Sequence, residues 1–292
     1  MNMAAMRGLQ DRLQAATRTL TEAGIPDGRR EAETLFAHIL NRPRLDLYRA
    51  DDFALDPDQQ EAFAGLIRRR ASREPLQYIL GTQEFWGLEF RVTTDTLIPR
   101  PETELLIEAV LERFGRPGPP VTMVDLCTGT GCLAVTLGTL YPTSRILATD
   151  CSPAALEVAR SNAARHGMAG RIEFVEGDLF KALPSMNLRH RIDLVTANPP
   201  YVPAGELDRL QPEVRYYEPR LALDGGCDGL DYYRRILPDA LEFVRPGGFL
   251  FLEVGIRQAI PVRDLAEGGG WRIDQIKKDL AGIDRVVVLR KP

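Results

Sequence analysis

The chain has 292 residues, of which 44% are hydrophobic and 27% charged, and its formal net charge is −4. That composition is typical of a globular protein with one large or two ordinary domains, and the negative charge gives no global basic field favouring nucleic acid. No apolar run reaches the roughly 18 residues that span a bilayer, and residues 1–6 lead into a charged segment without the apolar core of a signal peptide. We therefore expect a cytoplasmic enzyme or binding protein without a membrane partner.

The four cysteines and three histidines predict neither a metal site nor a disulfide framework. No two cysteines form a C-x-x-C pair, and the histidines are scattered along the chain. We expect no metal, and we expect Cys127, Cys132 and Cys151 to pack as small apolar residues beside strand ends.

Residues 1–80 are predicted to form a helical domain. Apolar residues recur at helical spacing in three stretches, which end at Gly24-Ile25-Pro26, at Asn41-Arg42-Pro43 and at Arg68-Arg69-Arg70. The arginine run is interpreted either as a solvated helix end, where cations suit the helix dipole, or as a contact with an acidic partner.

Residues 81–95 are predicted to form a hairpin linker, because Leu88, Phe90 and Val92 alternate as in a strand. A second domain is expected over residues 96–292. It opens with Pro101 followed by acids, which suits the first turn of a helix.

Strands and helices alternate from residue 121 onward. We expect strands over 121–126, 145–149, 172–175, 192–197, 248–254 and 285–289, the last closing the sheet, and helices over 132–140, 153–166 and 230–244, with a break or kink at Pro238. This alternation predicts an α/β, Rossmann-like fold with a mostly parallel sheet and helices on both faces. Ligands of such sheets bind at the carboxyl ends of the strands.

A glycine loop, Cys127-Thr128-Gly129-Thr130-Gly131, lies between the first of these strands and the helix that follows. Glycines allow a tight turn and a close approach of a ligand. Asp150, about 20 residues further on, is placed to accept both ribose hydroxyls of an adenosine ligand. Alone, the loop indicates either NAD or S-adenosylmethionine, or merely a tight strand–helix turn.

Two aspartates favour S-adenosylmethionine. Asp125 precedes the glycines, where it can hold the loop and the methionine end of the ligand. Asp178, after the third strand, can accept from the adenine amine, and Leu179 can cover the ring. For Asp178 a helix or turn cap is the alternative.

The tetrapeptide Asn198-Pro199-Pro200-Tyr201 follows the apolar run 192–197. The Asn198 side-chain oxygen and the Pro199 carbonyl can each accept one N–H of a planar NH2 group, and the Tyr201 ring can stack on its flat face. A proline-rich turn would explain the prolines but neither the asparagine nor the tyrosine. Together with the glycine loop, the tetrapeptide predicts a methyltransferase acting on an NH2 group.

At this point the chain resembles the release-factor glutamine methyltransferases, the HemK/PrmC family, over nearly its whole length. The resemblance includes the helical N-terminal domain, the Phe85–Leu88 hairpin, Leu97–Glu104, Asp125–Gly131, Asn198–Tyr201, Glu218–Leu223 and, most loosely, Asp279–Arg285. It implies transfer of a methyl group from S-adenosylmethionine to the side-chain amide nitrogen of the glutamine in the Gly-Gly-Gln motif of peptide chain release factors. It also implies that the N-terminal helices recognise the release factor.

The motifs and the resemblance together define an expected site. Cofactor binding is assigned to Cys127, Thr128, Gly129, Thr130, Gly131, Asp150, Asp178, Leu179 and Asn198. Substrate binding is assigned to Asn198, Pro199, Pro200, Tyr201 and Arg100, and catalysis to Asn198, Pro199 and Tyr201. Two positions depart from the family. Cys127 stands where the loop usually begins with glycine, and it fits comfortably only with a negative φ. Leu179 stands where some relatives carry an aromatic residue, so we expect weaker stacking.

Three other functions remain open. The first is a nucleic-acid adenine or cytosine amino-methyltransferase acting on a flipped base; the negative charge and the lack of a basic target-recognition domain oppose it. The second is a non-catalytic adaptor, which the intact Asn198–Tyr201 and Asp150 oppose. The third is an NAD-dependent enzyme, which leaves the tetrapeptide unexplained. We expect a monomer that does not bind nucleic acid directly.

Overall fold

The computed structural model describes residues 8–49, 55–116, 118–183 and 187–292. The chain forms two compact units, one of residues up to Gly81 together with Gln211–Tyr217, and one of Thr82–Leu210 together with Glu218–Pro292. The predicted hairpin linker thus counts with the second unit, and a short segment far along the chain counts with the first. Residues 1–6, on which the signal-peptide prediction was made, lie outside the described residues. No helix in the described ranges is long and apolar enough to cross a membrane.

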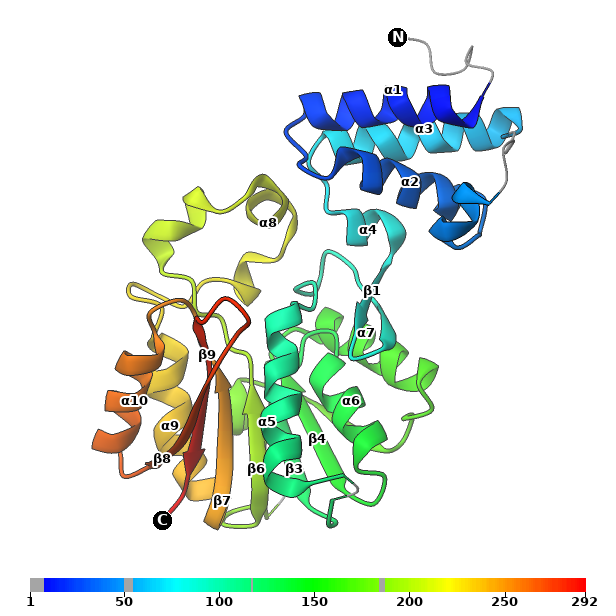
Figure 1. Cartoon of the computed structure of the whole chain (residues 1–292). Coiled ribbons are helices and arrows are strands. Elements are labelled where there is room, and N and C mark those ends of the chain that lie inside the picture. The colour runs from blue at the N-terminus through cyan, green and yellow to red at the C-terminus, as the bar shows by residue number, and fades with distance from the viewer. Residues whose placement is uncertain (1–7, 50–54, 117, 184–186) are drawn as a thin grey trace. The chain divides into compact units, whose positions relative to one another are not determined.

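The first unit is helical, as predicted (Figure 1). Its helices are α1 (Leu9–Glu22), α2 (Gly28–Ile39), α3 (Pro57–Ala71), the short α4 (Leu76–Leu80) and α8 (Pro212–Tyr217), with a 3-10 helix over Arg44–Tyr48. α3 begins at a capping box in which Asp56 and Gln59 bond reciprocally to each other's main-chain N–H. Phe36 and Phe63 meet edge to face in its core, their ring centroids 5.2 Å apart.

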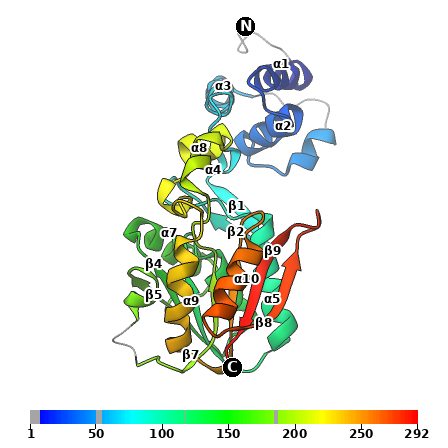
Figure 2. The ribbon, with the colours of Figure 1, turned by 90° about the vertical axis from the view of Figure 1, so that its left-hand side faces the viewer.

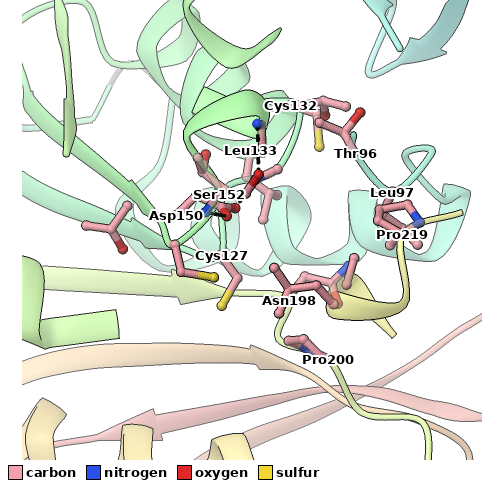
Figure 3. Close-up of a pocket in the computed structure, with 18 of the residues that line it drawn as sticks. Thr96, Leu97, Cys127, Cys132, Leu133, Asp150, Ser152, Asn198, Pro200 and Pro219 are labelled. Atoms are coloured by element: carbon pink, nitrogen blue, oxygen red, sulfur yellow. Dashed lines mark hydrogen bonds between the residues drawn. The ribbon is translucent and has the colours of Figure 1, made fainter. Parts of the chain in front are cut away.

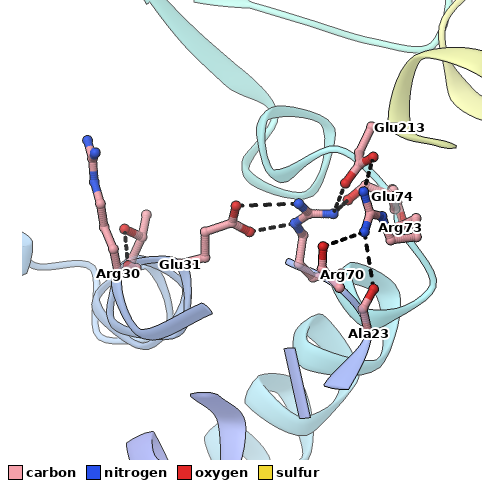
Figure 4. A network of polar contacts seen from close by, with 9 residues as sticks. Ala23, Arg30, Glu31, Arg70, Arg73, Glu74 and Glu213 are labelled. Carbon is pink, nitrogen blue, oxygen red and sulfur yellow. Dashed lines mark hydrogen bonds and ion pairs between the residues drawn. The ribbon is translucent and has the colours of Figure 1, made fainter. Parts of the chain in front are cut away.

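The arginine run at the end of α3 contacts acids of its own unit (Figure 4). Arg70, whose side chain is 6% exposed, pairs through Nε with Glu31 at 2.5 Å and through Nη1 with Glu213 of α8 at 3.0 Å. Arg73 pairs with the other oxygen of Glu213 at 2.7 Å. Arg70 is therefore neither a solvated helix end nor free for an acidic partner, because Glu31 and Glu213 neutralise it. Arg68 and Arg69, whose side chains are 65% and 47% exposed, fit a solvated helix end.

The second unit has a seven-stranded sheet in the order β5-β4-β3-β6-β7-β9-β8. The strands are β3 (Thr122–Leu126), β4 (Arg145–Asp150), β5 (Ile172–Glu176), β6 (Ile192–Ala197), β7 (Val244–Glu253), β8 (Arg272–Lys278) and β9 (Asp284–Arg290). β3 to β7 are parallel, and β9 runs antiparallel to β7 and β8. A separate hairpin joins β1 (Thr82–Phe85) and β2 (Leu88–Arg91).

Helices cover both faces of the sheet (Figures 1 and 2). One apolar cluster packs the sheet against α9 (Asp231–Phe243) and α10 (Ala259–Gly268). The other packs it against α5 (Glu104–Phe114), α6 (Cys132–Leu140) and α7 (Pro153–Arg165). The predicted α/β, Rossmann-like fold is confirmed. The predicted break at Pro238 is not found, because α9 runs through Pro238 as one helix.

One strand prediction was wrong. The strand over residues 285–289 does not close the sheet, because β9 lies between β7 and β8, and β8 is the edge strand on that side. β8 is polar and mostly half-exposed, and its register shifts between Ile273 and Gln275. An edge strand with this composition lacks the regular alternation by which a strand is recognised in sequence.

The strand order brings the predicted motifs to one edge of the sheet. Leu126 at the end of β3 pairs with Thr149 of β4 on one side and with Ala197 of β6 on the other. The chain moves outward from β3 to β4 and β5 and returns beside β3 as β6, so the switch in direction lies between β3 and β6. Ligands bind at such a switch point, and there the glycine loop, Asp150 and Asn198 leave their strands.

Candidate active site

A pocket lies at the carboxyl ends of these strands, within the second unit, and encloses about 940 Å³ including its open mouth (Figure 3). Residues from all the predicted motifs line it, namely Arg100, Cys127, Thr128, Gly129, Thr130, Asp150, Asp178, Leu179, Asn198 and Pro200. The structure therefore brings together most of the residues expected from the sequence.

The glycine loop turns sharply between β3 and α6. Gly129 and Gly131 have φ of 53° and 78°, in the left-handed region that glycine tolerates best. A Cβ on Gly131 would come within 3.1 Å of the Ala159 Cβ, whereas a Cβ on Gly129 would meet no atom closer than the Cys127 carbonyl at 4.0 Å. Gly131 thus permits close packing of α6 on α7, and Gly129 leaves the ligand side of the loop open.

Asp125, near the end of β3, holds this loop through hydrogen bonds. Its carboxylate accepts from the Thr128 hydroxyl at 2.6 Å and from the Thr196 hydroxyl of β6 at 2.7 Å. Burial raises the pKa of Asp125 to about 6, against the lowering effect of the two hydroxyls. These contacts show that Asp125 supports the loop. Asp125 is not among the pocket-lining residues, and its contact with the methionine end of a ligand stays a prediction.

Cys127 departs from the expected backbone geometry. Its φ is 56°, not negative, and Leu179 at the other departure from the family pattern has a φ of 54°. A side chain in the left-handed region costs roughly 1–2 kcal/mol. Both residues line the pocket. Their positive φ values mean that the backbone at these two positions has the left-handed geometry that suits glycine, although each residue carries a Cβ.

Asp150 is held rigidly at the end of β4. Its Oδ2 accepts from the Gly129 N–H and its Oδ1 from the Ser152 N–H, both at 2.9 Å. Burial raises the pKa of Asp150, and these backbone donors oppose that effect. Each carboxylate oxygen retains a lone pair for a further donor, which fits the predicted binding of two ribose hydroxyls.

Asp178 has a partner that the sequence did not predict. Its carboxylate pairs with Arg235 of α9 and more loosely with Lys181 at 3.4 Å. The Arg235 guanidinium lowers the pKa of Asp178, so the carboxylate is ionised at neutral pH. Leu179 is buried beside it. Asp178 and Leu179 remain predicted contacts of the adenine.

The tetrapeptide divides between the pocket and the core. Asn198 and Pro200 line the pocket, whereas Pro199 and Tyr201 are not among its lining residues. Tyr201 packs against the apolar cluster under α9, and a Cβ on Gly255 would stand 3.0 Å from its ring. Burial raises the pKa of Tyr201. Stacking of Tyr201 on the substrate stays a prediction.

Arg100 forms part of the pocket wall and pairs with a buried acid. Its Nη2 lies 2.5 Å from Oε1 of Glu218, whose side chain is 1% exposed. The other Glu218 oxygen accepts from the Ile98 N–H at 3.3 Å. Two segments that carried the family resemblance, Leu97–Glu104 and Glu218–Leu223, are therefore bound to each other.

Several polar residues of the site were missed. Thr103 accepts from the Asn198 amide Nδ2 at 3.2 Å and donates to the buried Glu253 at 2.7 Å. Thr103 and Glu218 lie in the segments that resemble the family, so those segments carried a signal. Glu253 and Arg235 lie in no motif, and nothing in the sequence marked them.

Comparison with known proteins identifies both parts of the chain. The family model described as the PrmC N-terminal domain matches residues 11–81, and that of the methyltransferase small domain matches residues 101–210. A crystal structure of a methyltransferase from Pyrococcus furiosus, 17% identical, matches with a TM-score of 0.54 over 77% of this chain and 98% of that one, which shows the fold.

Two proteins called release factor glutamine methyltransferase are much closer in sequence. The one from Geobacter sulfurreducens is 46% identical over 92% of this chain and 91% of its own length. The one from Cereibacter sphaeroides is 46% identical over 97% of this chain and 98% of its own. On identity at this level over nearly the full length of both chains, the protein belongs to the release factor glutamine methyltransferase family.

Proposed function

We propose that this chain transfers a methyl group from S-adenosylmethionine to the side-chain amide nitrogen of the glutamine in the Gly-Gly-Gln motif of peptide chain release factors. The observation that carries the proposal is the position of Asn198. Its amide lies in the wall of the same pocket as the glycine loop and Asp150. The relatives' names supply the substrate, because they specify a glutamine of a release factor.

The pocket residues fit S-adenosylmethionine. Asp150 has lone pairs to spare for the ribose, and Gly129 leaves the loop open to a ligand. The N-terminus of α6, at Cys132 and Leu133, borders the pocket and suits a carboxylate. When bound, S-adenosylmethionine supplies a methyl group on a positively charged sulfur, ready for transfer to a nucleophile.

The chain's own residues then have to orient a poor nucleophile. An amide lone pair is delocalised into its carbonyl, so orientation matters more than a strong base. The Asn198 Oδ1 and the Pro199 carbonyl would accept the two N–H groups, which favours the positive charge that develops on nitrogen. Tyr201 would fix the amide plane, and Arg100 would contact the backbone of the substrate loop. The acidic proton of the methylated amide would leave to water.

The helical unit would recognise the body of the release factor. The family model that matches residues 11–81 is described as the PrmC N-terminal domain, a domain separate from the methyltransferase domain, which supports a role in choosing the substrate. We further propose that the enzyme acts as a monomer in the cytoplasm and does not bind nucleic acid directly.

Mass spectrometry of a purified release factor, incubated with the enzyme and S-adenosylmethionine, tests the proposal. We expect one added methyl on the Gly-Gly-Gln glutamine, and none when that glutamine is replaced by glutamate. Asn198→Ala should abolish the gain while S-adenosylmethionine still binds. Thr139→Val, on the exposed side of α6, serves as the control variant and should methylate as the wild type does.

The opposite outcome is also informative. If the cofactor binds and no release factor gains a methyl, a nucleic-acid amino group becomes the substrate to test. Salt-sensitive binding to DNA or RNA would then support that function. Equal loss of cofactor binding and turnover in Asn198→Ala would contradict the role given to this residue.

A further inference from the structure

The Asn198 amide has two ends of nearly the same shape, and only one of them can accept an N–H. If the side chain turned by half a rotation, it would present its own NH2 to the substrate NH2, and the two donors would repel each other. The catalytic arrangement therefore requires something that fixes which end faces the pocket.

Thr103 and Glu253 together make that choice. The Thr103 hydroxyl has a single proton, which it donates to Oε2 of Glu253 at 2.7 Å. Its remaining lone pairs can only accept, and it accepts from Asn198 Nδ2 at 3.2 Å. While Glu253 is ionised, the asparagine NH2 must face Thr103, and Oδ1 is left for the substrate.

The fold places these three residues together. β6 and β7 are parallel neighbours, and Ala197 pairs with Leu252 in their register. Asn198 and Glu253, the next residues in sequence after this pair, are therefore neighbours at the ends of adjacent strands. Thr103 ends the 3-10 turn over Pro101–Thr103 that leads into α5, and it is 2% exposed. Glu253, also 2% exposed, has its main-chain carbonyl held by the Tyr233 hydroxyl at 2.7 Å.

We propose that Thr103 and Glu253 are positioning residues of the methyl transfer, which act on the substrate only by fixing the direction of the Asn198 amide. The inference rests on the proposed function, because it assumes that Asn198 receives the substrate amide. Neither residue would touch the reacting atoms.

The protonation state of Glu253 then controls the direction of the amide. Burial raises the pKa of Glu253 to about 7, while the Thr103 hydroxyl lowers it. A protonated Glu253 donates to Thr103, which frees the hydroxyl proton for Asn198 Oδ1 and permits the unproductive orientation. Turnover should therefore fall as the pH drops through about 7.

Glu253 faces several other charged or titratable groups. They are Glu102, which raises its pKa, the cations Arg285 and Arg100, which lower it, and Tyr201, Tyr233 and Cys132. Arginine stays charged over the whole range. Burial raises the pKa of both tyrosines, and that of Cys132 to about 12, so these three stay neutral.

The test compares Thr103→Val, which replaces the hydroxyl with a methyl, with Thr103→Ser, which keeps it. We expect Thr103→Val to lower kcat on the release factor about 100-fold, the loss typical of a misplaced catalytic group. The Kd for S-adenosylmethionine should change less than twofold. The kcat of Thr103→Ser should stay within about threefold of the wild-type value. The control variant Thr139→Val should have the wild-type kcat.

Glu253→Gln adds a readout that a merely structural role would not move. The kcat of the wild type should rise through an inflection near pH 7, and that inflection should be absent in Glu253→Gln. Wild-type kcat in Thr103→Val, equal losses in Thr103→Val and Thr103→Ser, or an unchanged inflection in Glu253→Gln would each overturn the inference.

A second measurement separates this inference from the proposed function. If the wild type binds cofactor but methylates no release factor, the proposed function fails, and NMR of the Asn198 side-chain NH2 still tests the contact. We expect slow proton exchange of this NH2 in the wild type and in Thr103→Ser, and faster exchange in Thr103→Val. Equal exchange in all three would overturn the inference by itself.

Discussion

Replacing Glu253 with glutamine should change how stability depends on pH. The pKa of Glu253 is about 7 in the folded protein, against an ordinary value of 4.5, chiefly because of burial. Between these values the folded state binds a proton that the unfolded state has released. The free energy of unfolding therefore falls as the pH rises from 4.5 to 7 and levels off above 7.

The size of the effect follows from the shift. At about 1.4 kcal/mol per pKa unit, the shift corresponds to roughly 3 kcal/mol between low and high pH. A glutamine side chain at this position would stay neutral at every pH. The variant therefore lacks this fall in the free energy of unfolding as the pH rises. Asp125, whose pKa of about 6 is raised in the same direction, titrates in both proteins and cancels in their difference.

Urea unfolding at a series of pH values between 5 and 8.5 measures that difference. Both tryptophans of the chain, Trp86 and Trp271, lie in the second unit, so their fluorescence follows the unit that contains Glu253. We expect the stability of the variant relative to the wild type to rise by about 2–3 kcal/mol over this range. A difference that stays constant within about 0.5 kcal/mol would refute the reasoning, since Glu253 would then ionise at its ordinary pKa.

Three further predictions concern single contacts. Because the φ of Cys127 is 56°, Cys127→Gly should be more stable than Cys127→Ala by about 1 kcal/mol in urea unfolding, and the reverse order would contradict a left-handed backbone there. Asp150→Asn should weaken S-adenosylmethionine binding about 10- to 100-fold by calorimetry, as expected for the loss of a hydrogen bond to a charged group; unchanged binding would remove Asp150 from the site. Glu213→Gln leaves Arg73 without its ion pair, so trypsin should cleave faster at Arg209 and Arg215, and an unchanged rate would show that Glu213 does not hold α8.

The parts of the fold that sequence predicted well are those whose local pattern agrees with their final environment. The strand over Ile192–Ala197 and the helix over Cys132–Leu140 are buried and apolar, and their bounds match the prediction. β8 was missed because an edge strand needs no apolar face. α8 was missed as part of the first unit because its place depends on Glu213 meeting Arg70 and Arg73.

The candidate site was predicted where its residues are consecutive in sequence. The glycine loop and the Asn198 tetrapeptide each combine a strand end with a turn, so both were visible without a structure. Contacts between such segments were not visible. Glu253 looks like any acid at the end of a strand until the register of β6 and β7 places it beside Asn198.

These hidden contacts explain why short motifs describe such a site incompletely. A buried polar group without a partner costs about 1–3 kcal/mol, so the buried Glu218 requires Arg100, and the buried Thr103 and Glu253 require each other. An asparagine transferred to another methyltransferase without this support would keep its hydrogen-bonding groups but lose their direction. Asn198 gives the site an acceptor, but only Thr103 beside an ionised Glu253 leaves that acceptor a single orientation.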